Sequence, residues 1–557
     1  MSCTSKISVL QEARKAYQPK LPGALKSGKF AVKELSVVEP PRDADEIKAL
    51  FPNTFGKPMV QIVAGDGKLS TDAMNVGVVL SGGPAPGGHN CIAGLYDALM
   101  AVNPASKLYG FLSGPKGVFT GKYVEITAEM VDDYRNTGGF DMIGSGRDKI
   151  ETDEQVLGCV KVLKELGCKA LVIIGGDDSN TNGAVLAEAF AAKGEKLQVI
   201  GLPKTIDGDM RNEHIEASFG FDTAAKTFSQ LVSNVCRDSA SARKYYHFIK
   251  LMGRSASHVA LEVALQVQPT ITLISEEIQE RNLSLNDIVN EICRVIAERA
   301  AKGLNYGVIV IPEGLLQFVN EFKSFFKDLE DLMRQHIDAI ESMPDKDKYP
   351  FVTRHLPPTS SALYASLPVN LQDVLLRTDS HGNLTVSQLE TEVFLIDCVK
   401  KKLDEMAKIG SFQGKFAAQP HFFGYEGRCG QPSNFDADYC YSLGYAGVQL
   451  IRAGLTGYTV SAQNLDAPAD EWVLGGIPVS SMLHIEIRKG QPKPVIEKCL
   501  VDLKGGPFQA FVTCRDEWKA VDAYKFVGPV QYWGPAEVCD APTITLELEG
   551  KKRKAAK

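Results

Sequence analysis

Two apolar runs, each followed by a loop rich in polar residues, constrain the fold of this chain more than any other feature. The runs cover residues 170–174 and 197–202, and both are typical of buried strands. The Ala-rich segment between them, residues 182–193, is helix-like, and Gly194 suits the end of a helix. Strand, helix and strand in this order predict a right-handed βαβ unit with two parallel strands.

The loops after these two strands carry several carboxylates and one lysine. They are Gly175-Gly176-Asp177-Asp178-Ser179 and Pro203-Lys204-Thr205-Ile206-Asp207-Gly208-Asp209. Because parallel strands end at the same edge of a sheet, both loops are expected at the edge where open α/β sheets bind ligands. A carboxylate for a metal, a cation for phosphate charge and a base for an alcohol suit phosphoryl transfer. Either loop alone is better explained as an acidic turn with an N-capping aspartate, whereas the two together favour a phosphoryl-transfer site.

The composition is typical of a soluble globular protein with more than one domain. A chain of 557 residues exceeds one ordinary core, and a net charge of −7 gives no reason to expect nucleic acid as a partner. The 12 cysteines lack CxxC spacing and no apolar signal segment opens the chain, so we expect reduced thiols and a cytoplasmic location. No apolar stretch approaches the ~20 residues that a membrane span needs.

A glycine-rich turn that contains Gly82 and Gly83 follows the buried-strand pattern of residues 75–80. It leads into a helix predicted over residues 90–102. Such a turn lets backbone N–H groups approach an anion at the helix start, although glycines also simply make tight turns. The turn lacks the spacing of a P-loop or of a full dinucleotide-binding fingerprint. A second glycine-rich loop, residues 138–147, ends in the cation Arg147.

Further along the chain, strands predicted at residues 247–251 and 306–311 again end in polar residues. The first is followed by Met252-Gly253-Arg254 and the second by Pro312-Glu313-Gly314. Helices predicted over residues 256–267 and 285–301 continue the alternation of strands and helices. Polar residues at several strand ends predict a second ligand edge, which suits a sugar phosphate.

Six short motifs resemble, in order, those of the phosphofructokinase family, and within it the long pyrophosphate-dependent type. They are Ser81-Gly82-Gly83-Pro84, Gly175-Gly176-Asp177-Asp178-Ser179, the run Pro203 to Asp209, Met252-Gly253-Arg254, Pro312-Glu313-Gly314 and Tyr425-Glu426-Gly427-Arg428. Each motif alone is common, but the ordered set is highly specific and covers most of residues 75–460. The resemblance implies phosphoryl transfer from pyrophosphate to the 1-hydroxyl of fructose 6-phosphate, with Mg²⁺ as cofactor.

The resemblance also implies the architecture. The expected fold class is α/β, with two phosphofructokinase-like domains whose central, mostly parallel sheets form three-layer αβα arrangements. We expect an N-terminal arm over residues 1–72, a donor domain over 73–240 and a sugar-phosphate domain over 241–314. A mainly helical insertion is expected over 315–410, with an irregular stretch over 350–368 and a helix over 386–402. Residues 411–557 complete both domains, with strands near 458–460 and 543–548.

Individual residues receive roles by the same resemblance. Asp207 takes the proton from the sugar hydroxyl, and Thr205 and Asp209 orient the reacting groups. Asp177 holds Mg²⁺. The residues implied to bind and select the donor are Gly82, Gly83, Arg147, Asp178 and Lys204. The residues implied to line the sugar-phosphate site are Thr205, Ile206, Asp207, Met252, Gly253, Arg254, Glu313, Tyr425, Glu426, Gly427 and Arg428. Lys244 and Tyr245 are implied to reach into the site of a partner subunit, so we expect a homodimer or a higher homo-oligomer.

The choice of donor rests on two positions. Relatives that use ATP carry glycine where this chain has Asp178 and Lys204. The Asp178 side chain would fill space and repel an α-phosphate, and Lys204 would narrow the same slot while neutralising pyrophosphate. Tolerated surface substitutions are the alternative explanation, which is disfavoured because both residues lie in the two loops that meet at the donor site.

Three other functions remain open from the sequence. The nearest is an ATP-dependent 6-phosphofructokinase of the same fold, which an assay with each donor separates. A non-catalytic regulatory subunit of a heteromeric complex is the second, but loss of Asp207 or Asp177 would mark such a chain and both are present. An NAD kinase also uses a Gly-Gly-Asp loop, but it would lack the motifs at Met252 and Tyr425.

Overall fold

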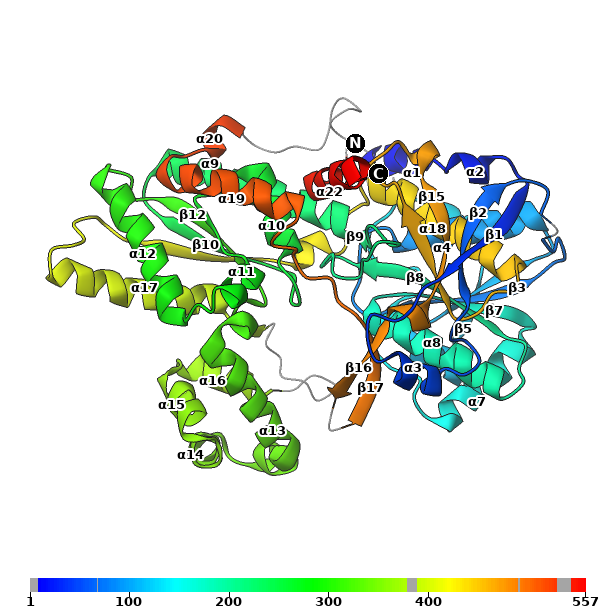
Figure 1. Ribbon diagram of the computed structural model, residues 1–557, viewed down its shortest axis with the longest axis horizontal. Helices are drawn as coiled ribbons and strands as arrows, with labels where there is room; N and C mark the ends of the chain where they lie inside the picture. Colours follow the sequence, from blue (N-terminus) through cyan, green and yellow to red (C-terminus); the bar gives the residue numbers. More distant parts are fainter. Residues whose placement is uncertain (1–8, 68, 378–387, 489–490, 528–541, 557) are drawn as a thin grey trace, which may run out of the picture. The chain divides into compact units, whose positions relative to one another are not determined.

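The structure is a computed structural model that describes residues 9–67, 69–377, 388–488, 491–527 and 542–556. The chain divides into two compact units. The first comprises Met1–Thr227, Tyr425–Cys499 and Tyr532–Lys557, and the second comprises Phe228–Gly424 and Leu500–Gln531. The sequence colours of Figure 1 show that each unit is assembled from distant parts of the chain.

The first unit is built on a large, mostly parallel sheet. Its strands, in spatial order, are β1 (Phe30–Val37), β2 (Pro58–Ala64), β15 (Val473–Pro478), β14 (Tyr458–Gln463), β8 (Gln198–Thr205), β7 (Cys168–Gly175), β3 (Asn75–Ser81), β4 (Lys107–Phe111) and β5 (Tyr123–Ile126). Two short strands, β6 (Ser145–Gly146) and β9 (Phe219–Gly220), pair with β3 and β8. The run β14, β8, β7, β3 and β4 is parallel throughout, as the alternation of strands and helices in the sequence predicts.

Helices cover both faces of this sheet. On one face, Gly183 of α8 (Asp177–Ala192) lies against Ile173 and Val199, and α7 (Asp153–Glu165) contributes to the same apolar cluster. On the other, Gly447 of α18 (Asn434–Arg452) lies against Leu202. The helix α4 (Gly88–Val102) packs on α18. Since side chains of a strand alternate between faces, this is a three-layer αβα arrangement, and the predicted fold class is confirmed.

Local sequence signals explain several boundaries in the first unit. A capping box at Thr152 and Gln155 starts α7. The helix α8 begins at Asp177, earlier than the residue 182 expected from its Ala-rich run. Gly176 is its N-cap, and the acidic residues of its first turn favour the positive end of the helix dipole. The other helices of this unit are α1 (Val9–Lys15), α2 (Gly23–Lys26), α3 (Ala44–Leu50), α5 (Pro115–Thr120), α6 (Ala128–Tyr134) and α22 (Ile544–Ala556), and α9 (Phe221–Ala242) continues into the second unit.

The N-terminal region holds two strands that the sequence analysis did not identify. Strands β1 and β2 pair antiparallel, and β2 pairs with β15. The exposed residues of β1 alternate poorly with apolar ones, so this edge strand lacks the pattern of a buried strand. The region therefore extends the sheet as well as packing on the body.

The strand predicted over residues 543–548 is wrong, because this segment belongs to helix α22. Its apolar residues alternate with threonine and glutamate over only a few positions, which is too short to distinguish a strand from a helix. The helix is anchored by an ion pair between Glu549 and Arg211, a residue that lies shortly after Asp209.

The second unit contains a smaller, fully parallel sheet. Its strands, in spatial order, are β11 (Ile271–Thr272), β12 (Gly307–Pro312), β10 (Tyr246–Leu251) and β13 (Ala418–Phe423). Phe248, Ile309 and Ile311 join one apolar cluster with helices α12 (Leu285–Ala301) and α17 (Thr391–Lys408). Helix α10 (His258–Val267) contacts β12 and packs on α19 (Gly506–Ala520). Short helices α11 (Ser275–Glu280) and α20 (Tyr524–Val527) complete this part.

The predicted helical insertion is present and shares the core of the second unit. It contains α13 (Asn320–Ser342), α14 (Asp345–His355), α15 (Pro358–Ser366) and α16 (Val369–Leu375). The irregular stretch expected over residues 350–368 is wrong, since α14 and α15 occupy most of it. Proline misled the prediction: Pro358 is the first residue of α15, where its missing N–H is harmless. Val352 and Tyr364, both buried in the cluster, favour the helices through packing despite Pro350.

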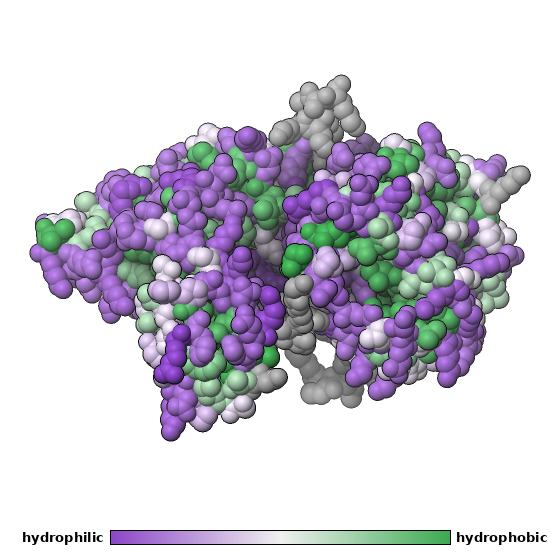
Figure 2. All heavy atoms as spheres, turned by 60° about the horizontal axis from the view of Figure 1, so that its bottom comes forward, coloured by the Kyte–Doolittle hydropathy of each residue, from purple (hydrophilic) through white to green (hydrophobic). Residues whose placement is uncertain are grey.

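The surface and the cysteines can be compared with what the composition predicts. The face drawn in Figure 2 is mostly hydrophilic, with apolar residues in small patches. Within the part of the chain that the structure describes, no helix combines the length and apolar character needed to cross a membrane. The ten cysteines in that part are free thiols, and six of them are buried.

Candidate active site

In the first unit, the predicted loops meet at one edge of the sheet. Strands β3, β7 and β8 are parallel neighbours, with Leu80 opposite Ile174 and Gly175 opposite Pro203. The Ser179 hydroxyl donates to the Ser81 hydroxyl at 2.8 Å, which joins the glycine-rich turn to the start of α8. The prediction that the two loops emerge together at the carboxyl ends of parallel strands is confirmed.

Lys204 lies within β8, buried behind the glycine-rich turn. Its side chain is 8% exposed, and a Cβ at Gly82 would lie 3.3 Å from its Nζ. Gly82 has a φ of +84°, which a residue with a side chain rarely adopts. Burial lowers the pKa of Lys204 to about 8, and the nearby Arg428 and Arg147 also lower it. The carboxylates of Asp207 and Asp177 act in the opposite direction and raise it. A buried ammonium therefore faces the turn, where an anionic ligand would contact it.

Two arginines approach the same turn from elsewhere in the chain. A Cβ at Gly83 would lie 2.5 Å from Arg428 Nη2 and 3.7 Å from Arg147 Nη2, so a side chain here would displace the Arg428 guanidinium group. Arg147 follows β6, which pairs with the end of β3. Together with Lys204, the two arginines form a dense group of cations around Gly82 and Gly83, as binding of a highly charged anion requires.

Carboxylates lie at the ends of β7 and β8. Asp177 is the first residue of α8, and Asp207 follows β8, where its backbone N–H donates to Thr205 Oγ1 at 3.0 Å. Asp209 is buried, and burial, together with the nearby Asp207 carboxylate, raises its pKa to about 7. Lys498 Nζ lies 3.4 Å from Asp177 Oδ2 and 3.7 Å from Asp209 Oδ2. Cations and carboxylates therefore stand side by side at this sheet edge.

The carboxylates fit a magnesium site in which the protein supplies only some of the ligands. In the residues that the structure describes, no three or more His, Cys, Asp or Glu side chains form a ready-made metal cage. Mg²⁺ usually takes one or two carboxylates and keeps waters or substrate phosphates as its other ligands. Asp177 and Asp209 already share one cation, the ammonium of Lys498, so their oxygens match that donor set.

Asp178 lies beside this group and is more open to solvent. It is the second residue of α8, its side chain is 50% exposed, and it pairs with Lys149 at 3.2 Å. The carboxylate is therefore not directed at the buried Lys204 but toward the rim of the site, where Lys149 holds it.

In the second unit, the ends of β10 and β12 form a second polar edge. Glu313 is buried after β12, and its carboxylate accepts from the Gly253 N–H at 2.9 Å. The N–H of Glu313 donates to Leu251 O at 3.0 Å, and the N–H of Met252 donates to Phe423 O at 3.0 Å. A Cβ at Gly314 would lie 1.9 Å from Arg254 O, so the backbones approach closely here. Met252, Arg254 and Glu313 thus lie at strand ends, as the sequence predicts, and their binding of a ligand stays a prediction.

Lys244 and Tyr245 lie at the other end of β10. They precede its first residue, Tyr246, whereas Met252 follows its last residue. A strand of this length spans roughly 20 Å. Lys244 and Tyr245 therefore cannot serve the same site as Met252 within a single copy of the second unit.

The motif from Tyr425 to Arg428 belongs to the first unit rather than to the second. Residues Tyr425–Gly427 form a short 3₁₀ helix, and Tyr425 is 70% exposed with the Arg428 guanidinium over its ring at 5.3 Å. Glu426 is exposed and Gly427 is buried. Arg428 is thereby placed beside the glycine-rich turn of Gly83, although the resemblance assigns it to the sugar phosphate.

Two lysines at this site were missed by the sequence analysis. Lys149 follows the second glycine-rich loop and pairs with Asp178, and its closeness to Arg147 is the only sequence signal for it. Lys498 directly follows the hairpin of β16 (Leu483–Arg488) and β17 (Gln491–Ile496), far from any motif. No local pattern marks it, because only the fold brings it to Asp209.

Comparisons with known proteins identify the family of the chain. The phosphofructokinase family model matches residues 75–451. The pyrophosphate–fructose 6-phosphate 1-phosphotransferase of Porphyromonas gingivalis is 49% identical over 98% of this chain and 100% of its own length. That of Treponema pallidum is 46% identical over 98% of this chain and 97% of its own length. A solved structure titled pyrophosphate-dependent phosphofructokinase from Nitrosospira multiformis has the same fold, with a TM-score of 0.51, 16% identity, and coverage of 77% of this chain and 86% of that one. The chain belongs to the phosphofructokinase family.

Proposed function

We propose that this chain transfers a phosphoryl group from pyrophosphate to the 1-hydroxyl of fructose 6-phosphate, giving fructose 1,6-bisphosphate and phosphate, in glycolysis or gluconeogenesis. The observation that carries the proposal is Lys204, a buried cation that faces Gly82 in the slot where ATP-using relatives are expected to have glycine. A lysine in that slot neutralises a compact diphosphate and removes the room that a nucleotide would need.

The reaction follows from the charges at the sheet edge. The sugar oxygen attacks the terminal phosphorus, the bridging P–O bond breaks, and inorganic phosphate leaves with the electron pair. Asp207 accepts the proton of the hydroxyl, and Thr205 Oγ1, which accepts from the Asp207 N–H, fixes the turn that carries the base. Lys204, Arg147 and Arg428 offset the negative charge that builds on the transferred group and on the leaving phosphate.

Magnesium is the cofactor that these residues fit. Asp177 would hold it, with Asp209 close by, and the bound ion would neutralise charge on the phosphate oxygens. Asp209 also orients the reacting groups, because its burial fixes the chain after Gly208.

The sugar phosphate is assigned to residues of the second polar edge and of the Tyr425 motif. They are Met252, Gly253, Arg254 and Glu313, with Tyr425, Glu426, Gly427 and Arg428. The bond from the Gly253 N–H to Glu313 supports this role, because it fixes the strand-end turn that carries Arg254, a cation suited to a phosphate.

The active form is assigned as a homodimer or a higher homo-oligomer. Lys244 and Tyr245 lie at the opposite end of β10 from Met252, so a residue pair that serves a sugar-phosphate site must serve that of another copy. The free thiols of the described cysteines support a cytoplasmic location, where thiols stay reduced.

The experiment that tests the function compares donors. The purified chain, with fructose 6-phosphate and Mg²⁺, should form fructose 1,6-bisphosphate from pyrophosphate with a kcat/KM far above that measured with ATP. The reverse reaction, started with fructose 1,6-bisphosphate and phosphate, should also run. A higher kcat/KM with ATP would instead establish an ATP-dependent kinase, and no turnover with either donor would favour a regulatory subunit.

A further inference from the structure

Lys498 is held in place by the backbone on both sides of it. The N–H of Glu497 donates to Met482 O at 3.0 Å, and the N–H of Cys499 donates to Asp209 O at 2.8 Å. Ile496 and Leu483 of the same hairpin pack with Met210 in one apolar cluster. The hairpin therefore delivers Lys498 to the carboxylates by structure, and not by chance contact of a mobile side chain.

The ammonium of Lys498 is shared between two carboxylates. It lies 3.4 Å from Asp177 Oδ2 and 3.7 Å from Asp209 Oδ2, while Asp207 interacts with Asp209 as a third negative group nearby. Lys204, whose pKa Asp207 and Asp177 raise, is instead buried against Gly82. Lys498 is thus the cation positioned on the Asp177 and Asp209 side of the site.

A cation at this position acts in opposite directions on the two ligands of the site. It repels a free divalent metal ion and occupies the carboxylate oxygens that the ion would use. It attracts a diphosphate, because the negative charge of the diphosphate exceeds the positive charge of a bound divalent ion. The net effect is to disfavour the metal alone and to favour the metal together with pyrophosphate.

We propose that Lys498 is a positioning residue that makes metal binding at Asp177 depend on the donor. The Lys498 ammonium pairs with Asp177 and Asp209 while the donor is absent, and it turns to the phosphate oxygens when metal and pyrophosphate arrive. The inference rests on the proposed function only in taking Asp177 as the metal-holding residue and pyrophosphate as the donor.

The test measures binding in the full chain rather than turnover. Free Mn²⁺ is titrated by electron paramagnetic resonance without donor, and methylenediphosphonate is titrated by calorimetry in the presence of Mg²⁺. Lys498→Met should bind Mn²⁺ about tenfold more tightly than wild type, because one positive charge has left the carboxylates. The same variant should bind the diphosphonate about tenfold more weakly. Lys498→Arg should stay close to wild type in both titrations.

Lys493→Met is the matched control. Lys493 lies on β17 of the same hairpin, but it pairs with Glu151 at 3.8 Å. Its loss removes the same charge from a strand five residues before Lys498, and both affinities should stay within about twofold of wild type, as expected for an exposed pair.

Three results would overturn the proposal. If Lys498→Met binds Mn²⁺ no more tightly than wild type, or if neither protein binds Mn²⁺, Lys498 does not compete with the metal ion for the carboxylates. Weakening of both ligands indicates a merely structural lysine. Equal changes in Lys493→Met indicate a general charge effect. Failure of the proposed function is distinguishable, since a chain inactive with pyrophosphate still reports its Mn²⁺ affinity.

Discussion

At the scale of single residues, burial and charge oppose each other around Lys204. Burial lowers its pKa to about 8, and the neighbouring arginines act in the same direction, while Asp207 and Asp177 raise it. Asp209 shows the converse, since burial and Asp207 raise its pKa to about 7. Groups that are held away from their ordinary pKa values by desolvation and by specific partners are typical of catalytic sites.

Replacing the base tests the role of Asp207. Asp207→Asn keeps the size of the side chain but removes its ability to accept a proton. Turnover with pyrophosphate should fall by roughly 10²–10⁴, the contribution of general base catalysis, while fructose 6-phosphate still binds. Steady-state kinetics and equilibrium binding of the sugar phosphate check both parts. A variant with near wild-type kcat would exclude Asp207 as the base.

Asp178 and Lys204 are expected to contribute differently to the choice between pyrophosphate and ATP. Asp178 adds negative charge beside an anionic donor, so its loss in Asp178→Gly should raise kcat/KM for ATP, with Lys149 no longer paired to it. Lys204→Met keeps the length of the side chain and loses its charge. Pyrophosphate turnover should then fall by roughly 10²–10³, the effect of one transition-state contact.

The measurement is kcat/KM for both donors in each single variant. ATP use that stays at background in Asp178→Gly would show that Asp178 does not exclude the nucleotide. Full pyrophosphate activity in Lys204→Met would show that the buried charge is dispensable.

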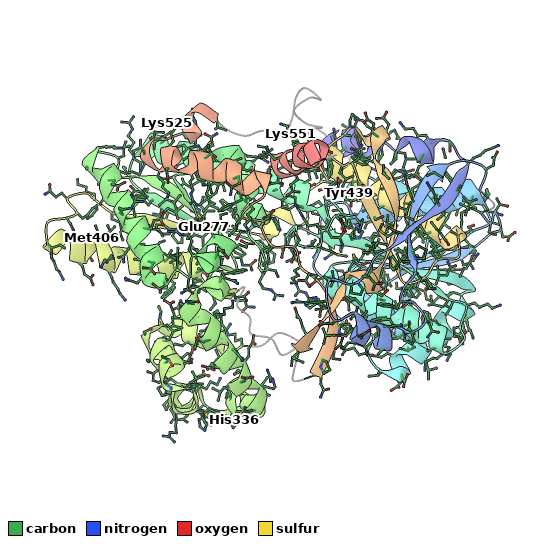
Figure 3. The ribbon with its side chains drawn as sticks, viewed as in Figure 1. Glu277, His336, Met406, Tyr439, Lys525 and Lys551 are labelled. Atoms are coloured by element: carbon green, nitrogen blue, oxygen red, sulfur yellow. The ribbon has the colours of Figure 1, made fainter. Side chains whose placement is uncertain are left out.

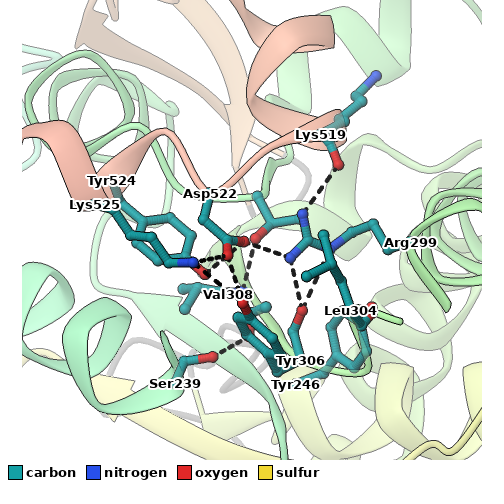
Figure 4. Close-up of polar contacts among 12 residues, drawn as sticks. Ser239, Tyr246, Arg299, Leu304, Tyr306, Val308, Lys519, Asp522, Tyr524 and Lys525 are labelled. Atoms are coloured by element: carbon teal, nitrogen blue, oxygen red, sulfur yellow. Dashed lines mark hydrogen bonds and ion pairs between the residues drawn. The ribbon is translucent and has the colours of Figure 1, made fainter. Parts of the chain in front are cut away.

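At the scale of elements, a polar network fixes the C-terminal segment onto the second unit. Asp522, between α19 and α20, accepts from Arg299 of α12 and from the Tyr306 hydroxyl, each at 2.6 Å, and pairs with Lys525 at 2.6 Å (Figure 4). Arg299 is 1% exposed, and Asp522 is the carboxylate that pairs with its charge. Lys525, labelled in Figure 3, lies in α20, three residues after Asp522 in the chain. The network therefore joins α12, the residue before β12 and the segment from α19 to α20.

Removing the central carboxylate should loosen this segment. Asp522→Asn leaves the buried Arg299 without a counter-charge, which costs about 3–5 kcal/mol. Lys525→Met, on the partly exposed rim, should cost less than about 1 kcal/mol. Urea unfolding followed by the fluorescence of Trp518, a buried residue of α19, measures both. Equal losses in the two variants would assign the stability to packing instead.

The network also predicts a dependence on pH. Burial raises the pKa of Asp522, but its bonds with Lys525, Tyr306 and Arg299 outweigh this and hold the pKa at about 2. Since the folded pKa lies below the unfolded value, the stabilisation is present above pH ~4 and is lost as the pH falls toward 2; it amounts to about 2 kcal/mol. The difference in stability between wild type and Asp522→Asn should therefore shrink over that range. A constant difference would contradict the shifted pKa.

At the scale of the whole molecule, the two ends of β10 point to a site completed by another copy. Lys244 is exposed and Tyr245 half-buried at one end, and Met252 lies at the other end. Closed symmetric assemblies use one surface patch on every subunit, so under the proposed function a donated pair on each copy would complete the site of its partner.

Mixing inactive chains tests the shared site. Asp207→Asn chains are combined with chains that carry Lys244→Ala and Tyr245→Ala. In each hybrid dimer one site has an intact base and intact donated residues, so a random mixture should recover about a quarter of wild-type activity. Native mass spectrometry establishes that hybrids form. Hybrids without activity would count against the donated pair.

Much of the site follows from local sequence patterns. The apolar runs before Gly175 and Pro203 predict two parallel strands, because each is short, is bounded by turn residues and is separated from the other by a helix-like segment. Their loops then lie at one edge, and the polar residues after β10 and β12 follow the same rule. The helices α14 and α15 were not predicted, since proline at a helix start looks like a break until buried Val352 and Tyr364 are seen to pack.

The sequence by itself determined the parallel strands, the carboxylates and cations at their ends, and the order of motifs that marks the family. Only the tertiary structure decided which distant side chains complete them: Lys498 at Asp177 and Asp209, Arg428 at Gly83, and Asp522 at Arg299. The physical reason is that hydrophobic periodicity is a local property read within one element. An ion pair between distant residues carries no such period, and it exists only once packing has brought the elements together.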